Sequence, residues 1–363
     1  MIVSGPIAGH PQQGGLAWIA LQYVLGFRRL GYEVYLVEPV DQLTPRVAGY
    51  FGEVTAAFGL EDRASLVVRG SRETAGVAYD ELPREADALL NFGGMLRDEE
   101  LTGRAAARIY LDLDPAFTQL WQDIEGIDMR LDGHTHFVTV GLGLGSAECA
   151  VFTSGQEWLT MLPPVVLEEW PVANGIAYEA LTTVANWRGY GSIEHEGVLY
   201  GQKAHSLRGL IQLPSLTEER LALALAIHPD EKRDLEALAA NGWELLDPLE
   251  VAGTPADYRD FVQGSKGELA IAKSGYVESG CGWFSDRSAC YLASGRPVIA
   301  QETGFSSYLP TGEGLLAFET VEAAVEAIEE VRGDYERHRR AARGLAEDLF
   351  DSDKVLSRLL EWL

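Results

Sequence analysis

The chain has 363 residues, 47% hydrophobic and 23% charged, so it can bury a substantial core and is long enough for two domains. Its formal net charge of −26 disfavours nucleic acid and anionic lipid as partners, because both bind through phosphate neutralisation. No apolar run approaches the roughly 20 residues of a membrane span, and the N-terminus lacks the basic start of a signal peptide. The three cysteines show no CxxC spacing. We therefore expect a soluble cytoplasmic protein with free thiols.

The first residues predict a βαβ unit. Met1–Ser4 is a short apolar strand, and Gly5–Gly15 is a loop rich in glycine and proline. An apolar helix over Leu16–Leu30 follows, and Tyr32–Glu38 is the next strand. A βαβ unit of this length predicts a parallel sheet. Further apolar runs extend that sheet: Ala64–Val68, Ala88–Phe92, Arg108–Leu113 and Phe137–Val140.

A proline-rich segment, Met161–Pro171, then interrupts the pattern and predicts an interdomain linker. The second half repeats the α/β alternation, and from Val321 onward the pattern is helical, with a break near 351–353. The predicted strands are Ala180–Ala185, Leu221–Ile227, Trp243–Leu246 and Leu269–Ile271, and the predicted helices are Ala204–Ile211 and Asp230–Asn241. We predict an N-terminal domain at 1–165, a C-terminal domain at 172–345, and a helix at 346–363 that crosses back to the first domain.

The segment from Gly282 to Thr320 is the most informative for function. A polar turn, Ser285–Ser288, opens a short helix that stops at Gly295, and the strand Val298–Ala300 and a second glycine turn follow. Free backbone N–H groups and hydroxyls at a helix start suit a diphosphate, and an arginine can neutralise it. We therefore predict that Ser285, Asp286, Arg287 and Ser288 hold such a group. An ordinary helix cap beside a surface arginine is the alternative.

Other residues are candidates because of their place at strand ends or helix starts. Lys203 begins a predicted helix, where its charge opposes the helix dipole, and a bound phosphate would relieve that conflict. Lys273 ends a strand and is expected to line a base or phosphate pocket. Asp112 and Asp114 close another strand before a proline. They are candidates for the catalytic base or for acceptor binding, and a simple turn is the alternative.

Two histidines two residues apart, His134 and His136, share one face of a predicted strand entry. They are candidates for a role in the cleft or for a metal, although the sequence shows no third ligand. The loop before the first helix has no GxGxxG pattern, and neither GxxxxGK[ST] nor HExxH occurs, which disfavours dinucleotide and P-loop sites.

In order along the chain, the sequence resembles GT-B glycosyltransferases. The resemblance lies in GGLAWIALQYVLGFRRLGYEV near the start, ASGRPVIA with ETGF and GEGLLAF near the end, and the closing AARGLAEDLFDSDKVLSRLL. It is strongest to a bacterial group identified by GGxxWxxLQYVLGxRRLGYEV and GWFSDRSxCYLASGRPVIAQ. It implies two Rossmann-like parallel-sheet domains facing across a cleft, with C-terminal helices packing back toward the first domain.

The same resemblance implies a metal-independent enzyme without a bound cofactor. It would transfer a sugar from a nucleotide-sugar with a UDP, GDP or TDP base to a small-molecule or glycan acceptor. Gly14 and Gly15 would approach the donor phosphate, Arg188 would reach the diphosphate, and His10 would be the general base of an inverting reaction. Glu302, Thr303 and Gly304 would read the sugar hydroxyls.

One departure from the family pattern keeps other functions open. Many retaining members carry a glutamate where this chain has Cys290. A nucleotide-sugar 2-epimerase on the same fold, or a GT-B-like protein that binds a nucleotide or glycan without catalysis, is therefore an alternative. Oligomeric state is left open.

Overall fold

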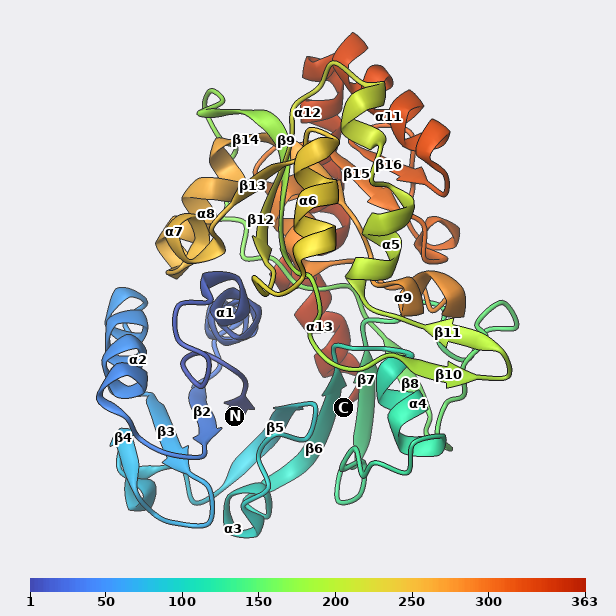
Figure 1. The fold of residues 1–363 in the computed structure, drawn as a ribbon. Coiled ribbons are helices and arrows are strands. Elements are labelled where there is room, and N and C mark those ends of the chain that lie inside the picture. Colours follow the sequence, from blue (N-terminus) through green and yellow to red (C-terminus); the bar gives the residue numbers. More distant parts are fainter.

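The computed structural model of the protein describes residues 1–363 and contains two parallel sheets, one in each half of the chain (Figure 1). The first sheet has eight strands in the order β4-β3-β2-β1-β5-β6-β7-β8, and only the β3–β4 pair is antiparallel. Its strands are β1 (Ile2–Ser4), β2 (Tyr35–Val40), β3 (Ala64–Val68), β4 (Thr74–Gly76), β5 (Ala86–Phe92), β6 (Ala105–Asp112), β7 (His136–Thr139) and β8 (Trp158–Thr160). Its helices are α1 (Gly14–Arg29), α2 (Pro45–Ala57), α3 (Glu99–Thr102) and α4 (Phe117–Asp123).

The second sheet has six parallel strands in the order β13-β12-β9-β14-β15-β16. They are β9 (Tyr178–Asn186), β12 (Leu221–Ala226), β13 (Glu244–Leu246), β14 (Ser265–Ala270), β15 (Val298–Gln301) and β16 (Leu315–Phe318); β10 (Ile193–His195) and β11 (Val198–Tyr200) form a separate hairpin. The helices are α5 (Lys203–Gly209), α6 (Lys232–Ala240), α7 (Pro248–Ala252), α8 (Pro255–Gly264), α9 (Ser274–Ser279), α10 (Asp286–Ala293), α11 (Val321–Gly333), α12 (Tyr335–Leu345) and α13 (Ser352–Trp362). None of the helices is long and apolar enough to span a membrane.

Most predicted elements are present, and the Rossmann-like pair of parallel sheets is confirmed. The second strand begins at Tyr35 rather than at Tyr32, because Gly31 adopts a positive φ of 88° and the chain needs three more residues to reach the sheet. The β10–β11 hairpin, the strands β4, β8 and β16, and the helices α4, α7, α8 and α9 were not predicted, and α2 and α3 were given no bounds. The break near residue 351 is real: a π turn over 346–350 separates α12 from α13.

The two halves share one core. The largest hydrophobic cluster joins buried side chains of α1 and β1 with others of α8, α10 and α13. Trp18 donates its indole N–H to the Pro255 carbonyl at 2.8 Å, and the Tyr50 hydroxyl donates to the Gly253 carbonyl at 3.0 Å. The two sheets are therefore docked through α1, α2 and the α7–α8 segment. The exact domain limits at 165 and 172 stay a prediction.

Helix α13 lies against α1 (Figure 1). Arg29 donates two hydrogen bonds to Asp353, each of 3.0 Å, and Leu356 and Leu359 are buried. Gly26 permits this approach, because a Cβ there would lie 2.5 Å from Leu356 Cδ1 and 3.1 Å from Ser352 Cβ. The predicted crossing of a C-terminal helix to the first domain is thus present.

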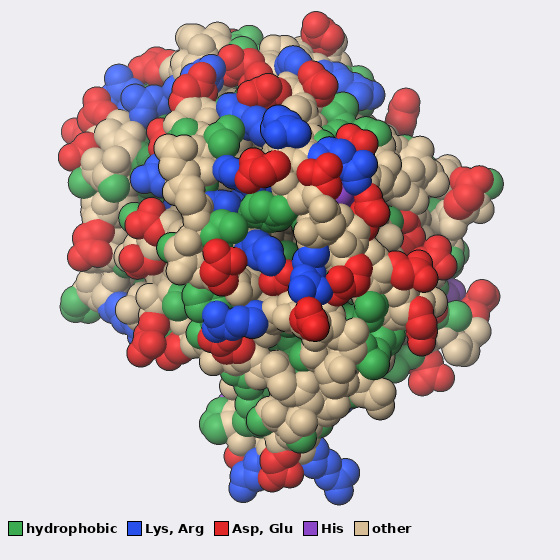
Figure 2. Space-filling view, turned by 90° about the horizontal axis from the view of Figure 1, so that it is seen from above, with side chains coloured by type: hydrophobic (Ala, Val, Ile, Leu, Met, Phe, Trp, Pro, Cys, Tyr) green, Lys and Arg blue, Asp and Glu red, His purple; other side chains and the backbone are tan.

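The surface is acidic, but the charges are dispersed. Figure 2 looks down on the C-terminal domain and shows acidic side chains spread over the face, with lysines and arginines among them. Many are paired, such as Arg208 with Asp234 at 2.7 Å and Arg220 with Glu244 at 2.7 Å. Exposed pairs of this kind contribute little stability each.

The contact between α1 and α13 gives a first prediction. Replacing Gly26 with Val should lower the free energy of unfolding by about 1 to 3 kcal/mol, because the added methyls overpack the interface. Gly52 in the exposed part of α2 has no atom within 4 Å of an added Cβ, so Gly52→Ala is the matched control. It should be neutral or stabilise by up to about 1 kcal/mol. Thermal unfolding followed by circular dichroism measures both, and equal melting temperatures would contradict the prediction.

Candidate functional site

A cavity of about 410 Å³ lies between the two halves of the chain. The first half contributes Gln12, Gln13 and the first turns of α1. The second half contributes the carboxyl ends of β9 and β12, the start of α10, and parts of α5, α7, α8 and α9. Strand β9 lies between β12 and β14, so the chain order reverses beside it. Ligands of open α/β sheets bind at this kind of switch point, outside the carboxyl ends of the strands.

Arg287 forms the floor of the cavity. Its Nε donates to Glu268 Oε1 on β14, and its Nη1 donates to the Val184 carbonyl at 3.1 Å. Glu268 is 0% exposed, so this is a buried ion pair. The remaining Nη2 and the second Glu268 oxygen have no partner. An unpartnered buried donor of this kind is costly unless a ligand satisfies it.

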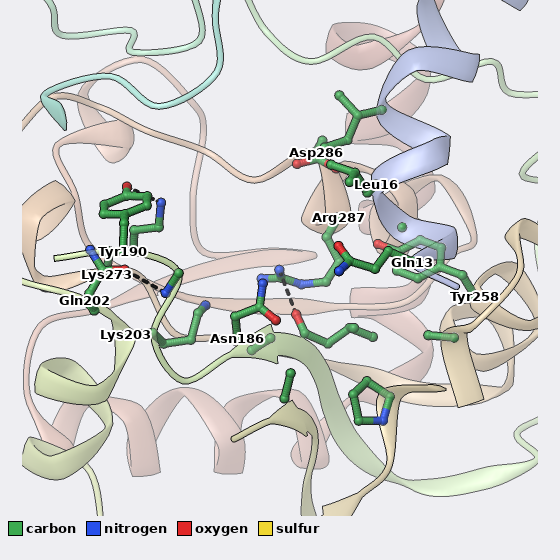
Figure 3. A pocket seen from close by; sticks show the side chains of 18 of the residues that line it. Gln13, Leu16, Asn186, Tyr190, Gln202, Lys203, Tyr258, Lys273, Asp286 and Arg287 are labelled. Atoms are coloured by element: carbon green, nitrogen blue, oxygen red, sulfur yellow. Dashed lines mark hydrogen bonds between the residues drawn. The ribbon is translucent and has the colours of Figure 1, made fainter. Parts of the chain in front are cut away.

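Lys203 is the second cation of the cavity. It is the first residue of α5 and only 8% exposed, and its Nζ donates to the Ile271 carbonyl. No carboxylate pairs with it. Burial, with the nearby positive charge of Arg287, lowers the pKa of the Lys203 amine well below its ordinary value. The positive form of Lys203 is therefore disfavoured in the empty cavity, and a bound anion would stabilise it. Figure 3 shows Lys203 and Arg287 on either side of Asn186.

Lys273, the third cation, connects the two halves. Its Nζ lies 3.0 Å from both carboxylate oxygens of Asp114, which follows β6 of the first sheet. The Tyr190 hydroxyl donates to the same carboxylate at 2.6 Å, and the Tyr276 hydroxyl also donates to it. The ammonium lies 4.3 Å from the centroid of the Tyr190 ring and 5.2 Å from that of Phe117. Asp114 is thus an interdomain partner of a cavity lysine.

Helix α10 begins at the cavity wall. Ser285 is its cap and accepts a hydrogen bond from the Arg287 amide at 3.2 Å. Asp286 and Arg287 line the cavity, whereas the Ser288 hydroxyl is buried without a partner. The predicted helix start at 285–288 is therefore present and faces the cavity with two of its four residues.

The two glycines before α1 serve the docking of the two halves. A Cβ on Gly14 would overlap the Thr254 carbonyl, and one on Gly15 would lie 2.7 Å from the Tyr258 ring. Gly15 also lines the cavity. Only glycine allows the start of α1 to approach the α8 segment this closely.

Several predicted residues lie outside the cavity lining. The Asp112 carboxylate is buried and accepts from Thr118, Gln119 and Thr139 side chains and from the Asp114 amide, at 2.7 to 3.1 Å. Burial raises the pKa of Asp112 despite these donors. Arg188 is paired with Glu231 at 2.6 Å. His10 is exposed in the loop after β1.

The second glycine turn, Glu302–Gly304, is held by hydrogen bonds within the protein. Glu302 Oε1 accepts from the amides of Thr303 and Gly304, at 3.0 and 2.6 Å, and the Thr303 hydroxyl donates to the Trp283 carbonyl at 2.6 Å. Gly304 has a φ of 93° and packs against the Gly280 carbonyl. None of these three residues lines the cavity, so their role in reading a sugar stays a prediction.

The two histidines lie at the amino end of β7, whereas the cavity lies at carboxyl ends of strands. His134 contacts the Asn91 amide nitrogen at 3.1 Å, and His136 packs its ring on Trp362 at 4.9 Å between centroids. No group of three or more His, Cys, Asp or Glu side chains comes close enough to hold a metal ion. The three cysteines are free.

Part of the lining was not among the predicted site residues, notably Gln13, Tyr190, Tyr258 and Trp283. Tyr258 comes from α8, and the sequence at the start of this helix contains a capping box that predicts a helix. Thr254 accepts from the Asp257 amide at 3.1 Å and Asp257 accepts from Thr254 in return, with Pro255 at the first helical position. For the aromatic residues the local sequence carries no signal that distinguishes a cavity wall from a core position.

Several solved structures resemble this protein over nearly the whole chain. HepE of Anabaena, in complex with UDP and glucose, matches with a TM-score of 0.61 at 12% identity, over 100% of this chain and 99% of that one. An α-glucosyltransferase in complex with UDP and a 13-mer DNA matches with a TM-score of 0.59 at 13% identity, over 99% and 97%. Sucrose-phosphate synthase of Thermosynechococcus elongatus matches with a TM-score of 0.54 at 12% identity, over 99% and 97%. No family model and no curated protein matches the sequence. These similarities show that the chain has the GT-B fold, as predicted.

The buried ion pair gives the second prediction. Arg287→Ala should lower the free energy of unfolding by about 3 to 5 kcal/mol, because Glu268 would be left charged and unpaired in the interior. The double variant Arg287→Met with Glu268→Gln should recover much of that loss. Arg188→Ala, which removes an exposed arginine, is the control and should change stability by no more than about 0.5 kcal/mol. Urea unfolding measures all three, and a stable Arg287→Ala protein would contradict the assignment.

Proposed function

We propose that the protein is a glycosyltransferase that transfers a sugar from a nucleotide-diphosphate sugar to a small-molecule or glycan acceptor. The observation that carries the proposal is the convergence of Lys203, Lys273 and Arg287, from three separate elements, on one cavity at the switch point of the second sheet. The surface as a whole is strongly acidic, with a net charge of −26. A cluster of three cations in one concave site of such a protein suits a diphosphate.

The fold supports the same proposal. The solved neighbours include proteins bound to UDP, one of them together with glucose. The cavity volume of about 410 Å³ lies within the range usual for a small-molecule site.

In the proposed reaction an acceptor hydroxyl attacks the anomeric carbon of the donor sugar. The bond from that carbon to the diphosphate oxygen breaks, and its electron pair leaves with the diphosphate. Lys203, Lys273 and the unpartnered Nη2 of Arg287 would stabilise this charge, with help from the first turn of α10. The proposal invokes no cofactor and no metal for this step.

The acceptor proton needs a base from the first domain. His10 in the β1–α1 loop is our candidate, because that loop continues into Gln12 and Gln13, which line the cavity, and because a histidine suits deprotonation near neutral pH. Asp114 is the second candidate, since it pairs with Lys273 at the cavity edge. Asp112 is bound on all sides by its own domain and suits a supporting role.

The third prediction tests the donor site. Lys203→Gln should weaken binding of the preferred nucleoside diphosphate by about 10- to 100-fold, because one charged contact to phosphate is lost. Lys203 is a better choice than Arg287, whose loss leaves Glu268 buried and unpaired. A thermal-shift scan with UDP, GDP, TDP, ADP and NAD identifies the base, and calorimetric titration of wild type, Lys203→Gln and the control Arg220→Ala measures the affinities; Arg220 is exposed and does not line the cavity.

Three outcomes of this scan differ in meaning. Stabilisation by one nucleoside diphosphate, weakened in Lys203→Gln and intact in Arg220→Ala, supports the proposal. Stabilisation by NAD alone, or by none of the five, would refute it. If a nucleoside diphosphate binds, incubation with its sugar conjugate then separates the alternatives: turnover without acceptor indicates an epimerase, and binding without any turnover indicates a non-catalytic protein.

A further inference from the structure

Asp286 is the one acidic residue among those that line the cavity. It is the first residue of α10, between the cap Ser285 and the buried Arg287. Figure 3 shows it beside Leu16 of α1, on the far side of Arg287 from Lys203 and Lys273. The cavity therefore has a cationic end and, next to α1, an end with a single carboxylate.

The carboxylate of Asp286 has no partner on any other side chain. The three cations of the cavity are engaged elsewhere: Arg287 with Glu268, Lys273 with Asp114, and Lys203 with the Ile271 carbonyl. Burial raises the pKa of Asp286, although the adjacent charge of Arg287 opposes the shift. The carboxylate is partly buried and faces only the backbone amides of Asp286 and Arg287 at the start of α10. A carboxylate can accept about four hydrogen bonds, so Asp286 keeps acceptor capacity on the side that lines the cavity.

The chemistry of a carboxylate restricts what that ligand can place there. An ionised carboxylate only accepts hydrogen bonds, and a diphosphate at neutral pH offers mainly further acceptors and negative charge. Placing the two in contact would be repulsive, whereas a hydroxyl group donates a charge-assisted hydrogen bond to the carboxylate. The part of the ligand next to Asp286 is therefore uncharged and bears hydroxyl groups.

We propose that Asp286 is a specificity-determining residue that accepts hydrogen bonds from hydroxyls of the donor sugar, while the cationic end holds the diphosphate. This inference rests on the proposed function and deepens it. It differs from the sequence-based prediction that all four residues of the turn 285–288 hold phosphate. Arg287 and Asp286, adjacent in the chain, would bind different portions of one donor. Neither Cys290 nor Glu302 lines the cavity, so Asp286 supplies the one carboxylate of the lining.

The test compares two ligands on one variant. Asp286→Asn keeps the shape of the side chain and removes its charge. Calorimetric titration with the free nucleoside diphosphate selected in the scan should give an affinity equal to wild type or a few-fold tighter. Titration with the corresponding nucleotide-sugar should give an affinity about 10- to 100-fold weaker, because a charge-assisted hydrogen bond is lost. The readout is the ratio of the two affinities, which a general loss of folding would leave unchanged.

Two further variants sharpen the comparison. Asp230→Asn removes an exposed carboxylate that does not line the cavity and controls for the change in net charge. It should leave both affinities as in wild type. Asp286→Glu keeps the charge but lengthens the side chain, and it should retain more of the preference for the nucleotide-sugar than Asp286→Asn does.

The outcomes separate this inference from the proposed function. If wild type binds no nucleoside diphosphate, the proposed function fails and this inference fails with it. If wild type binds both ligands and Asp286→Asn weakens them equally, only the inference is overturned. If Asp286→Asn keeps the affinity for the nucleotide-sugar but loses turnover, the carboxylate acts on the acceptor instead, and its assignment to the donor sugar is wrong.

Discussion

The candidate site depends on the buried ion pair between Arg287 and Glu268. Removing two charges from water costs several kcal/mol for each ion, and their attraction offsets this only when the geometry is good, so such a pair contributes little net stability. What the pair provides is a guanidinium fixed at the end of β14, below a cavity that two lysines also border. The unpartnered Nη2 of Arg287 and the second oxygen of Glu268 show that the polar groups here are not satisfied by the protein alone. A site that is incomplete in this way is arranged for a ligand.

A second constraint brings the two halves of the site together. The close approach of Gly14 and Gly15 to the α8 segment places the start of α1 against the second domain, and the Trp18 and Tyr50 hydrogen bonds hold it there. On the other side of the cavity, Asp114 pairs with Lys273 among aromatic rings. The contact at α1 depends on close backbone approach at the two glycines, whereas the contact at Asp114 is an ion pair. Because the cavity lies between them, its width follows the distance between the domains, and any movement of one domain would change the partners of Lys273.

The sequence allowed much of the fold and part of the site to be predicted. Period and turn signals identified most strands of the two sheets and the helix that begins at Asp286, because glycine turns and apolar runs are local features. The lysines at 203 and 273 and Arg287 were identified from their places at element ends. Residues such as Tyr190 and Tyr258 were missed, since an aromatic side chain at a cavity wall has the same local pattern as one in a core. Asp112 and Asp114 are two positions apart, yet the first is enclosed by Thr118, Gln119 and Thr139 and the second reaches the other domain. Only the tertiary arrangement separates them.

The packing of α13 on α1 has a consequence for biosynthesis. Arg29 and Asp353 are bonded to each other although 324 residues separate them. A ribosome adds about 5 to 20 residues per second, so on the order of 20 to 60 seconds pass between the synthesis of α1 and that of the helix that covers it. During that interval the apolar face of α1 around Gly26 lacks its covering helix, and the first domain emerges with a gap in its surface. The nascent chain therefore exposes an apolar, aggregation-prone surface until α13 has been synthesised. Chaperones that bind apolar helices would bind α1 during this interval.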